Sequence, residues 1–140
     1  MSVAVVHRDS PEGRAAIVIA AHEALQRRHQ LTVLHVPDEI VGGVVDGAPE
    51  PDEDLTAVRS AIQAALDAGD VGETSWTLRA AEPSEDPVTA LVDLVDDESP
   101  DFLVVGTRRK SAVGKFLLER WLQRVLLEVD VPVLVVKDPA

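Results

Sequence analysis

The segment 107–111 (TRRKS) is the feature of this 140-residue chain whose residue types best suit binding chemistry. It follows an apolar stretch at 102–105 that ends at Gly106, and it leads toward a predicted helix. Arginine binds phosphate and carboxylate groups through paired hydrogen bonds, and the first amides of a helix favour anions. Two interpretations stay open. The segment either captures a phosphate or another small anion, or it pairs with an acidic surface or a neighbouring subunit.

Composition excludes several classes of function. The 25 acidic residues outnumber the 13 lysines and arginines, for a formal net charge of −12, which argues against nonspecific binding to nucleic acid or to anionic membranes. Aromatic residues make up only 3% of the chain, so few rings are present to stack on bases. With no cysteine, disulfides, thiol catalysis and cysteine-based zinc sites are excluded. We therefore expect neither a nucleic-acid nor a membrane partner.

Established catalytic and cofactor motifs are absent. The chain has no G-x-G-x-x-G fingerprint, and seven residues separate Gly106 from Gly114 where a Walker loop has four. Phe116 also stands where that loop carries its Mg²⁺-binding hydroxyl, after Lys115. We therefore predict no dinucleotide site and no P-loop.

The four histidines give no catalytic or metal-binding pattern, since no two stand at i, i+4 on a helix. We expect His22 and His29 to face solvent on the first helix, and His35 to be a structural residue of a buried strand. His7 stands beside Asp9 and Ser10, but neighbours in sequence rarely have triad geometry. The sequence therefore predicts neither catalysis nor a metal site.

Apolar runs and amphipathic segments alternate along the chain, which predicts a parallel sheet covered by helices on both faces. We expect one domain over 1–140, a three-layer α/β/α arrangement, strand order 3-2-1-4-5 and a flexible loop at 37–53. Ligands of such sheets lie beyond the carboxyl ends of the strands, where the order reverses, so residues 7–9 and 106–115 would line the site. The predicted strands are 3–7, 31–36, 73–80, 102–105 and 132–136, and the predicted helices are 11–28, 55–68, 87–95 and 116–129.

The last third of the chain, at 101–125 and 131–137 (VPVLVVK), resembles the universal stress protein family. The segments 10–16 (SPEGRAA) and 31–36 (LTVLHV) agree, and Asp86-Pro87 matches the family's segment before the third helix. The similarity extends over essentially the whole chain. It implies an adenine nucleotide alpha-hydrolase-like, Rossmann-like sheet in the order 3-2-1-4-5, a cytoplasmic domain of the stress response, and homodimers.

Members of this family that bind ATP carry Gly-x-x-Gly-x₉-Gly-Ser/Thr after the fourth strand. Gly106 keeps the first glycine, whereas Arg109, Glu119 and Arg120 occupy the other three positions, and Arg8 stands at the Asp after the first strand. A carboxylate near the phosphates is repulsive, and guanidinium cannot accept hydrogen bonds as Asp does. We expect no cofactor and no bound ATP. The motif-equivalent positions for a nucleotide or anion are Arg8, Val36, Gly106, Arg108, Arg109, Gly114, Lys115, Glu119 and Arg120.

The last predicted strand lies at the edge of the sheet and is apolar throughout, which is an aggregation hazard unless it is covered. The resemblance implies antiparallel pairing with its copy across a twofold axis. The predicted helix 116–129 supports this, because its apolar surface exceeds what one contact with the sheet needs. The expected dimer interface consists of Val131, Val133, Leu134, Val135 and Val136.

These observations lead to one principal hypothesis and one alternative. The first is a non-catalytic stress-response domain that dimerises, associates with a protein partner and does not bind ATP. The alternative is a sensor that binds a nucleotide or a phosphorylated metabolite through the arginine-rich segment. No apolar run approaches 18 residues and the start of the chain lacks a signal-like segment, so we expect a cytoplasmic location.

Overall fold

The computed structural model describes residues 1–37, 55–82, 85–108, 111–112, 115–116 and 119–137. Five parallel strands form one sheet in the order β3-β2-β1-β4-β7, which confirms the predicted order 3-2-1-4-5 and the predicted fold class. The strands of this sheet are β1 (Ser2–Val6), β2 (Gln30–His35), β3 (Trp76–Ala80), β4 (Phe102–Thr107) and β7 (Val133–Lys137).

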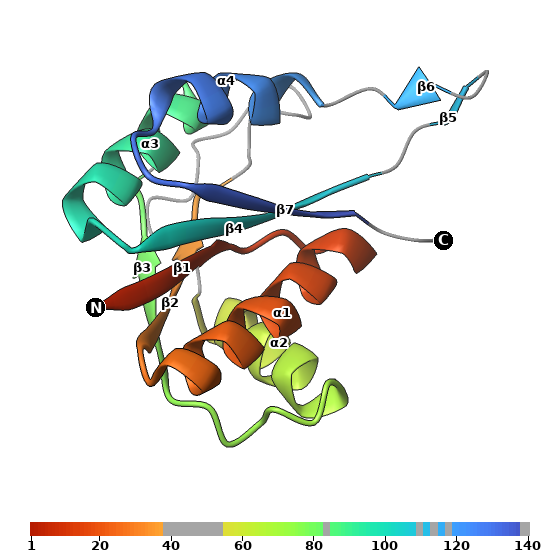
Figure 1. The fold of residues 1–140 in the computed structure, drawn as a ribbon, viewed down its shortest axis with the longest axis vertical. Coiled ribbons are helices and arrows are strands. Elements are labelled where there is room, and N and C mark those ends of the chain that lie inside the picture. The colour runs from red at the N-terminus through yellow and green to blue at the C-terminus, as the bar shows by residue number, and fades with distance from the viewer. Residues whose placement is uncertain (38–54, 83–84, 109–110, 113–114, 117–118, 138–140) are drawn as a thin grey trace, which may run out of the picture.

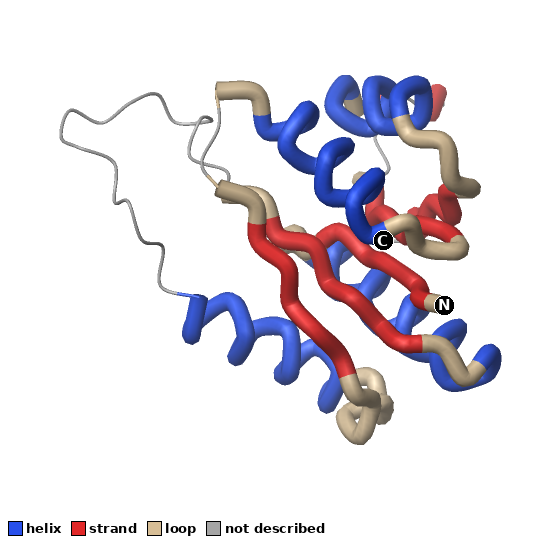
Figure 2. Tube along the Cα trace, turned by 90° about the vertical axis from the view of Figure 1, so that its left-hand side faces the viewer, coloured by secondary structure: helices blue, strands red, loops and turns tan. Residues whose placement is uncertain are grey.

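The helices of the described residues cover both faces of the sheet (Figure 1). Helices α1 and α2 lie on one face and α3 and α4 on the other, and Figure 2 shows the same sheet from the side. A short antiparallel pair, β5 with β6, follows β4 and projects away from the layers. The bounds of these elements are α1 (Pro11–Arg27), α2 (Leu55–Ala68), α3 (Pro87–Glu98), α4 (Arg120–Glu128), β5 (Ser111–Ala112) and β6 (Lys115–Phe116).

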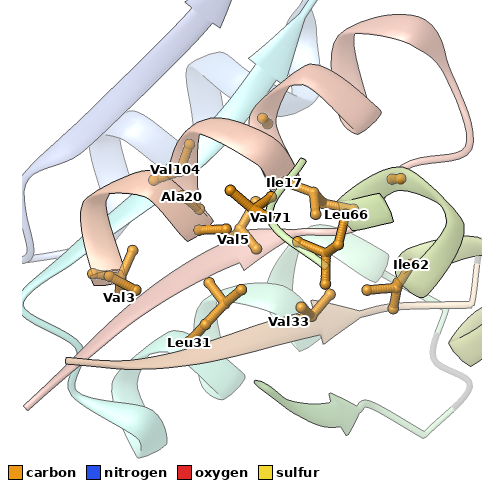
Figure 3. Close-up of a cluster of buried hydrophobic side chains, with 14 of the residues drawn as sticks. Val3, Val5, Ile17, Ala20, Leu31, Val33, Ile62, Leu66, Val71 and Val104 are labelled. Atoms are coloured by element: carbon orange, nitrogen blue, oxygen red, sulfur yellow. The ribbon is translucent and has the colours of Figure 1, made fainter. Parts of the chain in front are cut away.

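Two hydrophobic clusters, one on each face of the sheet, form the core. Successive strand residues point to opposite faces, so Val3 and Val5 of β1 pack under α1 and α2 whereas Ala4 and Val6 pack under α3 and α4. Figure 3 shows the first cluster, in which Val5 and residues of β2 meet side chains from both helices. All five residues of β1 are buried, as expected for the central strand of a two-sided parallel sheet.

Local capping signals determine where α1 and α3 begin. Ser10 accepts a hydrogen bond from the Gly13 amide at 3.1 Å, with proline in the first turn, as predicted. Asp86 caps α3 and also receives two hydrogen bonds from Arg124 of α4, at 3.0 and 3.2 Å. The pKa of the Asp86 carboxyl is lowered, mainly because the Arg124 guanidinium donates hydrogen bonds to it. This ion pair ties the start of α3 to α4.

The predicted helix 116–129 is wrong at its start. Residues 115–116 pair with 111–112 as β6 and β5, and the helix begins only at Arg120. Glu119 has extended backbone angles (φ −62°, ψ 148°) and no side-chain cap bond, because its carboxylate contacts the end of β4 instead. The predicted strand bounds differ from those observed by up to three residues. Of the predicted flexible loop 37–53, only residue 37 lies within the described part of the chain.

Helix α1 approaches β1 and β4 so closely that two positions leave no room for a side chain. A Cβ atom at Gly106 would overlap the carbonyl group of Glu12, and one at Gly13 would overlap the carbonyl oxygen of Arg8. Gly106 is therefore required by the packing of backbone on backbone, whether or not a ligand binds nearby.

Within the described residues, none of the helices combines the length and apolar character needed to cross a bilayer.

We predict that Gly106→Ala destabilises the protein by about 1–3 kcal/mol, since the backbone of α1 must shift to admit the methyl group. Urea unfolding followed by circular dichroism measures the change. Gly72→Ala is the matched control, because its Cβ would overlap the carboxylate end of Asp67, a side chain that can rotate away, and would meet backbone only at an ordinary contact distance. Equal stability of the two variants would contradict this explanation.

Candidate functional site

The candidate site lies at the carboxyl ends of β1 and β4, where the sheet order reverses and where the sequence predicts it. Arg8 follows β1, Thr107 ends β4, and Glu119 precedes α4. The described structure brings these three residues together although they are far apart in the chain. Their contacts are mainly with each other and with Trp121.

The carboxylate of Glu119 is the centre of this arrangement. Its Oε2 accepts hydrogen bonds from the Thr107 hydroxyl at 3.2 Å and from the Arg108 backbone amide at 3.1 Å. Its Oε1 accepts a bond from the indole Nε1 of Trp121 at 3.2 Å. Thr107 is fully buried, so its hydroxyl needs an acceptor, and Glu119 provides one. An internal anion thus uses three hydrogen-bond donors at the end of β4.

Arg8 interacts electrostatically with this carboxylate. Its guanidinium lies over the Trp121 ring, 4.8 Å from the ring centroid. Partial burial acts to raise the pKa of Glu119, but the three hydrogen bonds and the charge of Arg8 outweigh it. The net effect lowers the pKa of this carboxyl below its ordinary value of 4.5. Glu119 is therefore ionised at neutral pH and held in place.

Two further arginines of the predicted site point toward solvent. The Arg108 side chain is 63% exposed, and its Nε lies 4.0 Å from the Glu12 carboxylate, a long contact for an ion pair. Arg120 is exposed at the first position of α4. Both side chains are exposed, whereas Arg8 is stacked on Trp121, so an anion could reach Arg108 and Arg120 more readily.

The other predicted site residues have separate outcomes. Gly106 lies at the site, where helix packing accounts for it, and Val36 follows β2 and is half-buried. Lys115 lies in β6 rather than in a helix. Arg109 and Gly114 lie outside the described residues.

The expected dimer interface lies at the β7 edge of the described sheet, with β4 as the neighbour of β7 on its other side. Leu134 is 40% exposed, Val133 and Val135 are half-buried, and Val136 packs into the core. The half-buried Val131 precedes the strand. An apolar edge is thus present as predicted, and whether a second copy covers it stays a prediction.

Sequence reasoning missed a contact between two histidines. Nδ1 of His7 lies 3.3 Å from Nδ1 of His35, at the carboxyl ends of β1 and β2. The register of β1 and β2 would have indicated this contact, because it places His7 opposite His35. A search for histidines four residues apart on a helix cannot detect a pair on two strands. His29 was also misplaced, since it follows α1 and its Nε2 lies 2.8 Å from a carboxylate oxygen of Asp101. Among the described residues, no group of three or more histidines and carboxylates could hold a metal ion.

Comparison with known proteins agrees with the resemblance seen in the sequence. The profile of the Universal stress protein family matches residues 1–137. A universal stress protein of Mycolicibacterium smegmatis is 30% identical over 135 residues, which are 96% of each chain. A solved universal stress protein of Archaeoglobus fulgidus superimposes with a TM-score of 0.72 at 20% identity, over 98% of this chain and 93% of that one. A universal stress protein in complex with cAMP superimposes with a TM-score of 0.66 at 21% identity, over 98% and 96%.

We predict that Glu119 contributes stability above its ordinary pKa and that this contribution is lost as the pH falls through the lower pKa of the folded state. The stability difference between wild type and Glu119→Gln should therefore shrink on acidification from about pH 6 to about pH 3, measured by urea unfolding. Glu73→Gln, which replaces an exposed carboxyl, is the control and should differ from wild type by the same amount throughout. A constant difference for Glu119→Gln would show that its carboxylate is not stabilised by these contacts.

Proposed function

Since the chain belongs to the universal stress protein family, we propose that it acts in the stress response as a non-catalytic, cytoplasmic homodimer that associates with a protein partner and does not bind ATP. The single observation that carries this proposal is the position of the Glu119 carboxylate, which accepts the Arg108 amide and the Thr107 hydroxyl. In ATP-binding relatives, the motif position that Glu119 occupies here is a glycine.

The physical reason is competition for donors. A phosphate at the end of β4 would need the same amide and hydroxyl that Glu119 already uses. It would also lie beside an ionised carboxylate, and two unit charges about 4 Å apart repel by about 1 kcal/mol in water and by more when partly buried. Arg8 attracts anions, but its guanidinium is stacked on Trp121 and already interacts with Glu119. These effects all oppose the family's way of holding a triphosphate.

A non-catalytic role is supported by the same contacts. A general base must be free to take a proton, whereas the Glu119 carboxylate accepts three hydrogen bonds and its pKa is lowered. Arg8 and Arg108 cannot act as bases near neutral pH because guanidinium stays protonated.

A second candidate function is supported by the exposure of Arg108 and Arg120. These side chains could hold a small phosphorylated ligand at the surface without displacing Glu119. A structural relative was solved with cAMP, which makes cyclic and monophosphate nucleotides the natural probes.

Dimerisation is supported by the apolar edge at β7. Leu134 is 40% exposed on this strand, and Leu127 near the end of α4 is 85% exposed. An uncovered apolar strand edge invites pairing, and an antiparallel contact with a second copy would satisfy its open backbone groups.

We predict that millimolar ATP leaves the melting temperature of the wild-type protein unchanged. A ligand at one hundred times its Kd would add about 2.7 kcal/mol of stability, which a thermal shift assay detects readily. The quadruple variant Arg8→Asp, Arg109→Gly, Glu119→Gly, Arg120→Ser restores the family motif, and ATP should raise its melting temperature.

AMP, cAMP and inorganic phosphate are the other ligands of that assay. Stabilisation by one of these but not by ATP would favour the second candidate function, and Arg108→Ala should then abolish it. A clear shift of the wild type with ATP would refute the proposed loss of triphosphate binding.

We also predict that light scattering at micromolar concentration gives about twice the chain mass of 15.0 kDa. Leu134→Lys should give a monomer, since a charged side chain on an exposed strand edge blocks pairing. Leu25→Lys is the matched control, because Leu25 is similarly exposed (45%) but lies on α1. A wild-type monomer would contradict the prediction, as would loss of the dimer in both variants.

A further inference from the structure

The contact between His7 and His35 has no part in the function proposed above. In the pairing of β1 with β2, Val6 stands opposite Leu34, so His7 and His35 form the next pair along the two strands. The alternation of side chains directs both toward the face covered by α1 and α2, since Val5 and Val33 pack there. Adjacent parallel strands therefore bring two imidazole rings together at one edge of the sheet.

Backbone hydrogen bonds hold both residues in position. The His7 amide donates to the Leu34 carbonyl at 2.8 Å, and the His35 carbonyl accepts from the Ala81 amide at 2.9 Å. His35 is 9% exposed, whereas His7 is more accessible to solvent. His35 is thus the more enclosed residue of the pair and His7 the more accessible one. The backbone of both residues is thus held in place at the ends of two paired strands.

The geometry of the two rings suits a shared metal ion. Their Nδ1 atoms are 3.3 Å apart, their centroids are 5.3 Å apart, and their planes make an angle of 52°. At this separation the two nitrogens are also within reach of a hydrogen bond to each other, with the donor depending on the tautomer. Two imidazole nitrogens that each bind one tetrahedral Zn²⁺ at about 2.0–2.1 Å lie about 3.3–3.4 Å from one another. The observed separation therefore fits two ligands of one tetrahedral ion.

The charge of the chain as a whole favours cations over anions. The chain carries a net charge of −12. The nearest cation in sequence, Arg8, is held over the Trp121 ring, which belongs to the side chains packed on the opposite face of the sheet. His7 and His35 also take part in further interactions.

We propose that Nδ1 of His7 and Nδ1 of His35 bind one divalent transition-metal ion, with Zn²⁺ as the representative case. Neutral imidazole suits Zn²⁺, Ni²⁺ and Cu²⁺, whereas Mg²⁺ prefers oxygen ligands. Within the described residues no third histidine or carboxylate joins the pair, so water or a small anion completes the coordination. A four-coordinate ion would then have two positions filled by the imidazoles and two filled by exchangeable water or anion.

Isothermal titration of the untagged, full-length protein with ZnCl₂ tests the proposal. We expect one ion per chain for the wild type, no binding of MgCl₂, and a loss of affinity of about tenfold or more in both His7→Gln and His35→Gln. His22→Gln and His29→Gln are matched controls, because His22 is exposed and His29 is paired with Asp101. These two variants should bind Zn²⁺ as the wild type does.

A second measurement needs no variant and so does not depend on whether His35→Gln folds. In ¹⁵N spectra of the histidine rings, one equivalent of Zn²⁺ should shift the Nδ1 signals of His7 and His35 and leave those of His22 and His29 unchanged. The proposal is overturned if millimolar Zn²⁺ does not bind, if only His22 or His29 responds, or if both His7→Gln and His35→Gln bind with unchanged affinity. In any of these cases the pair is an ordinary hydrogen bond between two strand ends. The result is independent of the nucleotide and dimer experiments.

Discussion

The close contact between the first turn of α1 and the ends of β1 and β4 is the constraint on which the rest of this structure depends. The carbonyl groups of Glu12 and Arg8 lie where side chains at Gly106 and Gly13 would stand. This contact sets the position of α1 on the sheet and brings the segments after β1 and β4 within reach of each other. In a parallel sheet these carboxyl ends share one edge, so Arg8, Thr107 and Glu119 lie together there.

At that edge lies a negatively charged group of the protein itself, the Glu119 carboxylate. The Glu119 carboxylate accepts hydrogen bonds from the Thr107 hydroxyl, the Arg108 amide and the Trp121 indole. Arg8, which lies over the same indole ring, provides a positive charge nearby. Three hydrogen-bond donors near the end of β4 and the start of α4 are thus already used within the protein. On the other face of the sheet, at the same edge, two imidazoles meet. The alternation of strand residues separates these two groups of side chains.

The sequence predicted the framework because the framework depends on local patterns. Apolar runs that alternate with amphipathic segments led to a parallel sheet covered by helices, and the resemblance to the family implied its strand order. Ser10-Pro11 and Asp86-Pro87 correctly marked the starts of α1 and α3. The start of α4 was missed for an equally physical reason. Residues 116–119 have helical periodicity, but the contacts of Glu119 with a strand end 11 and 12 residues earlier keep its backbone extended.

Hydrophobic periodicity and capping residues act between neighbours in the chain, so the sequence by itself determined the five strands of the main sheet, the four helices between them and the starts of α1 and α3. The partners of Glu119 and the meeting of His7 with His35, 28 residues away, were decided only by the tertiary structure. Such contacts require the register of paired strands and the direction of particular side chains. Those follow from the packing of the whole domain, which no short segment of the chain encodes.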